Sequence, residues 1–184
     1  MTKREQEKLK KTAYHEAGHA VGAFAIGRRF NKVTIVPDDD TLGSLTGCGW
    51  GSKLSPELDE GARLRHRVEA EIILSLAGCV AEAKMTGGCD HIGASGDYND
   101  AVFYASYVTD STEETEAYIA WLLEKTKNVL SRRWDAVELL ADELIKRREI
   151  GYKAAREIIR KGLDGHLPPL DLKKALAKKD QGAK

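Results

Sequence analysis

The pattern His-Glu-x-x-His at residues 15–19 constrains this chain of 184 residues more than any other feature. Two histidines four positions apart lie on one face of a helix, with Cβ atoms about 5–6 Å apart, so both imidazoles can bind one metal ion. Glu16 points in another direction and can take a proton from a water on that metal. The alternative is a pair of surface histidines on an ordinary helix. It is weaker because chance gives this pattern in about one such sequence in a hundred.

The motif lies in a segment, residues 3–26, that we expect to be helical. The second half of this segment is rich in small residues, among them Ala17, Gly18 and Gly22. Small side chains let another element approach the helix backbone closely, which offsets the cost of glycine in a helix. Gly27 is expected to end the helix.

Downstream patterns predict a small sheet and several helices. Residues 32–36 are β-branched at four consecutive positions and predict a strand, and residues 42–46 predict a second one. Ser55-Pro56-Glu57 is typical of a helix start. Apolar residues then recur every four positions, which predicts one buried helical face ending at Gly87-Gly88. These residues are Leu64, Val68, Ile72, Leu76 and Val80.

Four further helices are expected at 97–108, 112–131, 134–148 and 153–160. Trp121 and Trp134 fit helical spacing and are expected in the core. The fold class is therefore α+β, mostly helical with a small β-sheet. We expect one domain over residues 1–160 and a mobile Lys-rich tail over 161–184.

The overall charge and hydropathy exclude several classes of protein. Lys plus Arg and Asp plus Glu both number 29, so the chain has no net charge that would attract nucleic acid or anionic lipid. No apolar run approaches the roughly 18 residues of a membrane span, and the charged N-terminus lacks a signal core. The three cysteines are expected to be reduced, and the protein to be cytoplasmic.

A catalytic zinc site needs a third protein ligand and leaves a fourth position to water. Spacing does not identify this ligand among the acidic residues and histidines downstream. The candidates are Glu69, Glu71, Glu82, His91, Asp97 and Asp100. A separate metal site formed by Cys79 with Cys89 and His91 is a weaker possibility, because the paired C-x-x-C spacing of zinc knuckles is missing.

The chain resembles the peptidase domain of the FtsH-type AAA zinc metalloproteases. The resemblance covers roughly residues 11–160, with motifs in the same order as in that family. The matching segments are residues 12–20 (TAYHEAGHA), 32–37 (KVTIVP), 42–43, 77–78, 81–82, 93–95 (GAS) with Asp97, and the helices at 128–159. The chain departs from the family pattern at Cys79, Ala83 and Gly96, and it has no Walker A motif, ATPase module or membrane anchor.

The resemblance implies a zincin-like fold and a particular set of site residues. His15, His19 and Asp97 would bind Zn²⁺, with Asp97 coming from another helix because it lies 97 − 19 = 78 residues after His19. An alternative role for Asp97 is a helix N-cap. Glu82 matches a family glutamate and is interpreted as a residue that orients one imidazole; a partly buried charge with a local partner is the alternative.

We therefore expect a stand-alone zinc-dependent endopeptidase that hydrolyses unfolded or flexible polypeptides without ATP. The substrate is expected to pair beside residues 42–46 as an extended strand. Two alternatives remain: a non-catalytic helical interaction module stabilised by zinc, and an excised peptidase piece of a larger AAA protease. A homo-oligomer and a separate ATPase partner are possible within this interpretation.

Overall fold

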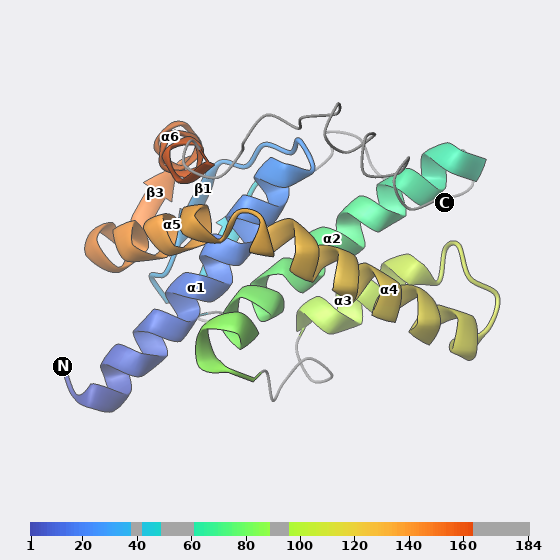
Figure 1. Cartoon of the computed structure of the whole chain (residues 1–184), viewed down its shortest axis with the longest axis horizontal. Helices are drawn as coiled ribbons and strands as arrows, with labels where there is room; N and C mark the ends of the chain where they lie inside the picture. The colour runs from blue at the N-terminus through green and yellow to red at the C-terminus, as the bar shows by residue number, and fades with distance from the viewer. Residues whose placement is uncertain (38–41, 49–60, 89–95, 164–184) are drawn as a thin grey trace, which may run out of the picture.

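A computed structural model describes residues 1–37, 42–48, 61–88 and 96–163 (Figure 1). The helix start predicted at Ser55, the loop at 89–95 and the tail from residue 164 lie outside these ranges. The described elements, in chain order, are α1 (Lys3–Ala25), β1 (Lys32–Thr34), β2 (Ser44–Thr46), α2 (Gly61–Thr86), α3 (Gly96–Ala105), α4 (Thr112–Ser131), α5 (Trp134–Arg147), β3 (Glu149–Gly151) and α6 (Tyr152–Leu163).

Helix α1 begins at a capping box and ends at the glycine that was expected to stop it. The Thr2 hydroxyl accepts from the backbone N–H of Glu5, and the Glu5 carboxylate accepts from the N–H of Thr2, which forms a capping box. The helix stops just before Gly27, whose φ of +76° suits glycine and disfavours other residues. Because the chain turns away at this point, the His-Glu-x-x-His motif lies in the last three turns of a long helix.

The small residues of α1 form its contact with α2. A Cβ added at Gly18 would lie 2.5 Å from the carbonyl oxygen of Ala77 and 2.6 Å from the Cβ of Ala81. One added at Gly22 would lie 2.8 Å from the Cβ of Ala77. Real Cβ atoms do not approach this closely, so the two backbones can pack at this distance only because both positions are glycine. The expectation of close helix packing is confirmed.

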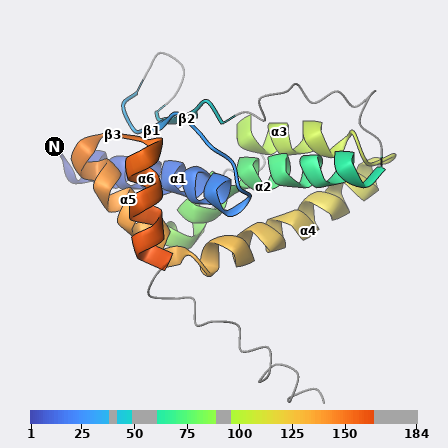
Figure 2. The same ribbon diagram turned by 90° about the horizontal axis from the view of Figure 1, so that it is seen from above.

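Helix α2 is the central element of the helical part of the fold. The apolar stripe predicted every four residues is buried, and Gly87 follows the helix with a φ of +84°. Helix α2 packs against α1, α3 and α4, and α1 also packs against α5 (Figures 1 and 2). The helix is therefore positioned to bring α3 close to the motif on α1.

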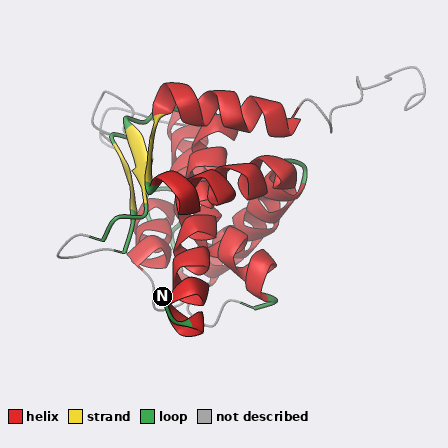
Figure 3. Cartoon of the chain, turned by 90° about the vertical axis from the view of Figure 1, so that its left-hand side faces the viewer, coloured by secondary structure: helices red, strands yellow, loops and turns green. Residues whose placement is uncertain are grey.

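The sheet lies along one side of the helices and has the order β2-β1-β3, with both pairs antiparallel (Figure 3). Both predicted strands exist but are shorter than expected, at residues 32–34 and 44–46. The third strand, β3, was not predicted because three residues between two helices leave no strand-length pattern. Since β1 is central, β2 forms one edge of the described sheet.

The two tryptophans that were expected in the core are less buried than predicted. Trp121 is 50% exposed, and its ring contacts Tyr118 and Lys125 on the surface of α4. The buried stripe of α4 instead includes Leu122, Thr126 and Leu130, because an apolar residue at a helical interval can belong to either of two neighbouring faces. Trp134 is half-buried and packs against the core.

The last helix also differs from its prediction, since α6 continues to Leu163 past the domain boundary expected at residue 160. One apolar core joins α1, α5, α6 and the sheet, and a second fills the space between α2, α3 and α4. The α+β class, mostly helical with a small sheet, is confirmed. None of the described helices has the length and apolarity needed to span a membrane.

Candidate metal centre and cleft

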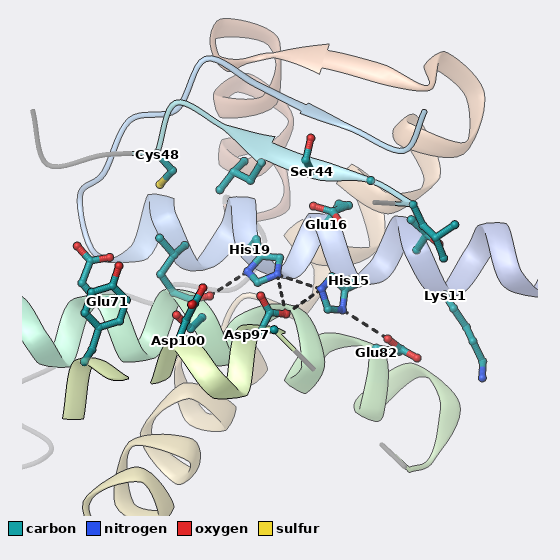
Figure 4. Close-up of a pocket in the computed structure, with 18 of the residues that line it drawn as sticks. Lys11, His15, Glu16, His19, Ser44, Cys48, Glu71, Glu82, Asp97 and Asp100 are labelled. Atoms are coloured by element: carbon teal, nitrogen blue, oxygen red, sulfur yellow. Dashed lines mark hydrogen bonds and ion pairs between the residues drawn. The ribbon is translucent and has the colours of Figure 1, made fainter. Parts of the chain in front are cut away.

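The two histidines of α1 point toward one another and away from the helix (Figure 4). Their Nε2 atoms are 3.0 Å apart. The Nδ1 of His19 lies 2.9 Å from the backbone carbonyl oxygen of Leu74 on α2. A carbonyl can only accept, so Nδ1 carries the proton and the Nε2 lone pair faces His15. This arrangement orients His19 as metal-binding histidines are usually oriented.

Asp97 brings a carboxylate to the same point from α3. Its Oδ2 lies 3.1 Å from the Nε2 of His15 and 3.4 Å from the Nε2 of His19. Tetrahedral zinc with bonds of about 2.0–2.3 Å separates neighbouring ligand atoms by roughly 3.3–3.8 Å. The 3.4 Å separation falls in this range, and the separations of 3.0 and 3.1 Å lie just below it, so a small outward movement of the side chains would admit a zinc ion between the three donor atoms.

Gly78 of α2 leaves room beside these donors and was not recognised as a site residue from the sequence. A Cβ at this position would lie 2.3 Å from the Nε2 of His19 and 2.6 Å from the Nε2 of His15. A side chain would therefore occupy the space that the two nitrogens face. The only signal in the sequence was the match of residues 77–78 to the resembled family.

Two further residues of α2 contact the donors. The Oε2 of Glu82 lies 3.4 Å from the Nδ1 of His15, which is the contact expected of a residue that orients this imidazole. The Sγ of Cys79 lies 3.8 Å from the Oδ2 of Asp97. The ligand atoms of His15, Cys79 and Asp97 all fall within 4.8 Å of one another. The sequence singled out Cys79 as a departure from the family pattern and as a possible ligand with Cys89 and His91, but not as a neighbour of Asp97. Its closeness to Asp97 is a result of the packing of α3 on α2.

Proximity shifts the pKa values of the cluster in the metal-free protein. Burial would lower the pKa of His15, but hydrogen bonds to Asp97 and Glu82 outweigh it and raise this pKa to about 10. Burial would raise the pKa of Asp97, but the hydrogen bond from His15 and the closeness of both imidazoles hold it well below its usual range. Both shifts have the same cause, which is the closeness of an acidic and a basic group in a buried position.

Glu16 lies on the floor of a cleft of about 860 Å³ that contains the donor cluster and runs along the sheet edge (Figure 4). Its side chain is buried, and burial raises its pKa although His19 and His15 act in the opposite direction. A Cβ at Gly43 would lie 2.9 Å from the Cγ of Glu16, so the chain leading into β2 passes directly over this carboxylate. Leu42, Gly43, Ser44 and Leu45 line the same cleft.

The structure places the other candidate ligands away from the donor cluster or in other pairs. Glu71 lines the cleft but forms a two-point ion pair with Arg28. Glu69 pairs with Lys125. Asp100 lines the cleft, one turn beyond Asp97 on α3. His91, together with the possible Cys89 site, falls in residues that the structure does not describe. Of the candidate third ligands, Asp97 is therefore the described residue that meets both histidines.

Comparison with known proteins finds similarity to a peptidase family and to proteins named as zinc metalloproteases. The model of peptidase family M41 matches residues 1–110. The chain is 34% identical over 172 residues to the ATP-dependent zinc metalloprotease FtsH of Rickettsia bellii (strain RML369-C), covering 87% of this chain and 25% of the relative. It is 30% identical over 153 residues to the ATP-dependent zinc metalloprotease YME1L1 of Rattus norvegicus, and the match covers 81% of this chain and 20% of the relative. The chain thus spans a quarter or less of the length of these relatives.

Proposed function

This chain belongs to peptidase family M41 as an FtsH-type peptidase domain, and we propose that it is a zinc-dependent endopeptidase acting on unfolded or flexible polypeptides. In this proposal His15, His19 and Asp97 hold Zn²⁺, and Glu16 is the catalytic base. The proposal includes a zincin-like fold and a peptidase domain over residues 1–160, with α6 continuing to Leu163.

One observation carries the proposal: a single cleft contains the donor cluster, a buried carboxylate and β2, which is an edge strand among the described residues. The donors fit the metal, and Glu16 lies beside them without belonging to the donor set. The segment leading into β2 passes over Glu16, so a peptide held along that edge would have its backbone close to the base. A structural metal site would need neither a buried base nor a strand edge.

The residues of this cleft have distinct roles in hydrolysis. When bound, zinc polarises the scissile carbonyl and lowers the pKa of a water from 15.7 toward about 7. Glu16 accepts the proton of the attacking water and passes it to the leaving amine. Burial raises the pKa of Glu16 in the metal-free protein, which makes this carboxylate a better proton acceptor for the first transfer. Glu82 and the Leu74 carbonyl keep the two imidazoles aimed at the metal.

We expect the substrate to bind as an added strand beside β2. The backbone of Ser44–Thr46 pairs with β1 on one side only within the described sheet. An extended peptide can form backbone hydrogen bonds along the other side, which requires no particular side-chain sequence. The exposed side chain of Leu42 lies at the start of this edge and offers an apolar contact. Unfolded or flexible polypeptides satisfy these requirements, whereas folded domains do not.

The decisive experiment combines metal analysis with hydrolysis of casein, with and without a chelator. We expect about one zinc per chain, hydrolysis of casein, and loss of hydrolysis on chelation that added zinc restores. Zinc binding without hydrolysis would instead support the non-catalytic helical module. Hydrolysis that survives complete removal of the metal would contradict the proposal.

Hydrolysis by this chain should not require ATP, because the sequence has no nucleotide-binding motif. The relatives are named as ATP-dependent, so a separate ATPase partner and a homo-oligomer are part of the proposal for activity on folded substrates. A stable domain carrying a disordered tail tests this point without nucleotide. Since folded domains open rarely, with unfolding free energies of about 5–15 kcal/mol, only the tail should be trimmed. Rapid digestion of the folded domain would contradict this expectation.

A further inference from the structure

We infer that Cys79 is a positioning residue that aims the Asp97 carboxylate at the metal site. This inference rests on the proposed function of the same site. The Cys79 side chain is 4% exposed and lies on α2, and its Sγ is 3.8 Å from the Oδ2 of Asp97. This oxygen is the one that faces the Nε2 atoms of both histidines.

Cys79 completes a pattern in which each donor contacts an orienting group on α2. His19 donates to the Leu74 carbonyl, His15 contacts Glu82, and Asp97 accepts from the thiol of Cys79. Among the contacts of the described residues, the thiol is the group outside the two histidines that hydrogen-bonds the Asp97 carboxylate. Partners of this kind typically change metal affinity by about 10–100-fold when they are removed.

Asp97 needs such a partner more than the histidines do. It lies in the first turn of α3, a helix of ten residues in which Ala101 and Ala105 are buried. A carboxylate at the end of a short helix has several rotamers, and ordering it costs conformational entropy. A thiol that donates to Oδ2 occupies one lone pair and leaves the others for the metal. The contact therefore fixes the direction of the donor that comes from the most distant part of the sequence.

Direct binding of the metal by sulfur is the competing role. The Sγ of Cys79 lies 3.8 Å from the Oδ2 of Asp97, a distance that allows either role. A fourth protein ligand, however, would close the position that a catalytic site keeps for water. The need for this open position favours action of Cys79 on Asp97 rather than on the metal.

The test compares Cys79→Ala with Cys79→Ser, because the two differ mainly in a hydroxyl donor. Zinc affinity is measured by competition with a chromophoric chelator, and folding of the metal-free proteins by thermal unfolding. We expect Cys79→Ala to bind zinc about 10–100-fold more weakly and Cys79→Ser to recover most of this loss. Cys48→Ala is the matched control, since this second described thiol lines the same cleft away from Asp97 and should leave zinc affinity unchanged (Figure 4).

The other possible results contradict either the positioning role of Cys79 or the proposed function. If Cys79→Ala binds zinc as tightly as the parent, the positioning role is wrong and the proposed peptidase stands. If the cobalt-substituted parent has a sulfur-to-cobalt charge-transfer band that Cys79→Ala lacks, the sulfur is a ligand and the positioning role is again wrong. A parent chain that binds no zinc overturns the proposed function as well. Should Cys79→Ala be unfolded without metal, the shape-matched pair Cys79→Thr and Cys79→Val decides by the same comparison.

Discussion

The two halves of the proposed metal centre are stabilised in different ways. Helix α1 supplies His15, Glu16 and His19 from a 23-residue helix whose last three turns are almost entirely buried. Helix α3 supplies Asp97 from ten residues, and its Val102 and Phe103 are exposed, the latter by 56%. The geometry of the first half follows from the pitch of one helix, whereas that of the second depends on how α3 packs on α2.

Because of this difference, the two halves are expected to contribute to different properties of the site. The α1 half carries the proposed base and two of the three proposed metal ligands, and its close contact with α2 resists movement. The α3 half carries one donor, on a helix with few buried side chains. We therefore expect variants in the α1 half to affect catalysis or global stability, and variants in the α3 half to affect mainly metal occupancy.

The largest effect is expected for Glu16→Gln. The amide has nearly the same size but cannot accept the water's proton, so casein hydrolysis should fall by about 10²–10⁴-fold while zinc content stays at the parent level. The measurement is the hydrolysis rate together with zinc per chain. Loss of zinc from this variant at neutral pH would show that Glu16 belongs to the donor set, and the proposed separation of roles would be wrong.

Asp97→Ala should lower zinc affinity at least about 100-fold, the upper end of the effect of losing an orienting partner, and activity should fall with it. Asp100→Ala is the matched control, one turn along α3 in the same cleft, and should keep the zinc. Zinc affinity and unfolding of the metal-free proteins are measured on both variants. An N-cap role alone would instead cost Asp97→Ala about 1 kcal/mol of stability without loss of metal.

Glu71→Ala tests the α1 half through stability rather than metal. The ion pair of Glu71 with Arg28 joins the end of α1 to α2, with side chains only 12% and 5% exposed. Removing the carboxylate leaves the buried guanidinium without this partner, which should cost about 3–5 kcal/mol in chemical denaturation at unchanged zinc stoichiometry. Glu69 is on the same helix as Glu71 and forms a more exposed ion pair with Lys125 of α4. Glu69→Ala should therefore cost only about 0–1 kcal/mol. Loss of zinc from folded Glu71→Ala would reinstate Glu71 as a ligand.

The smallest effects are expected on stability, when one glycine in each half is replaced by alanine. Gly18→Ala should destabilise the protein by about 1–3 kcal/mol, because its new Cβ would meet the Ala77 carbonyl and the Ala81 side chain in the α1–α2 contact. Gly96→Ala in α3 has open space around its new Cβ and should be neutral or slightly stabilising. Thermal unfolding of the metal-free proteins measures both. Equal effects would show that the two halves do not differ in packing.

Several features of this protein could be predicted from the sequence because they depend on neighbours along one helix. The spacing of His15 and His19 fixes a shared face, and the apolar stripe of α2 fixes its buried side, since 3.6 residues per turn leaves little choice. The capping residues and Gly27 define where α1 starts and stops. The small residues of α1 predicted a close neighbour, although not which one.

Other features were decided by the tertiary structure. The sequence left six candidates for the third donor, and the resemblance pointed to Asp97, but only the packing of α2 between α1 and α3 brings its carboxylate within 3.4 Å of both imidazoles. The orienting role of the Leu74 carbonyl has no sequence signal, because every residue has a carbonyl. The thiol of Cys79 became relevant only when α3 was positioned beside it.

The sequence did not predict the exposure of Trp121 or the strand β3, and the reason is the same for both. A tryptophan at helical spacing is buried only if another element covers that face, and three residues form a strand only if a neighbouring strand pairs with them. Within one helix, covalent geometry and hydrogen bonds set all distances, so sequence spacing determines them. Between helices, distances follow from the sum of many packing contacts, and no single spacing in the sequence encodes that sum.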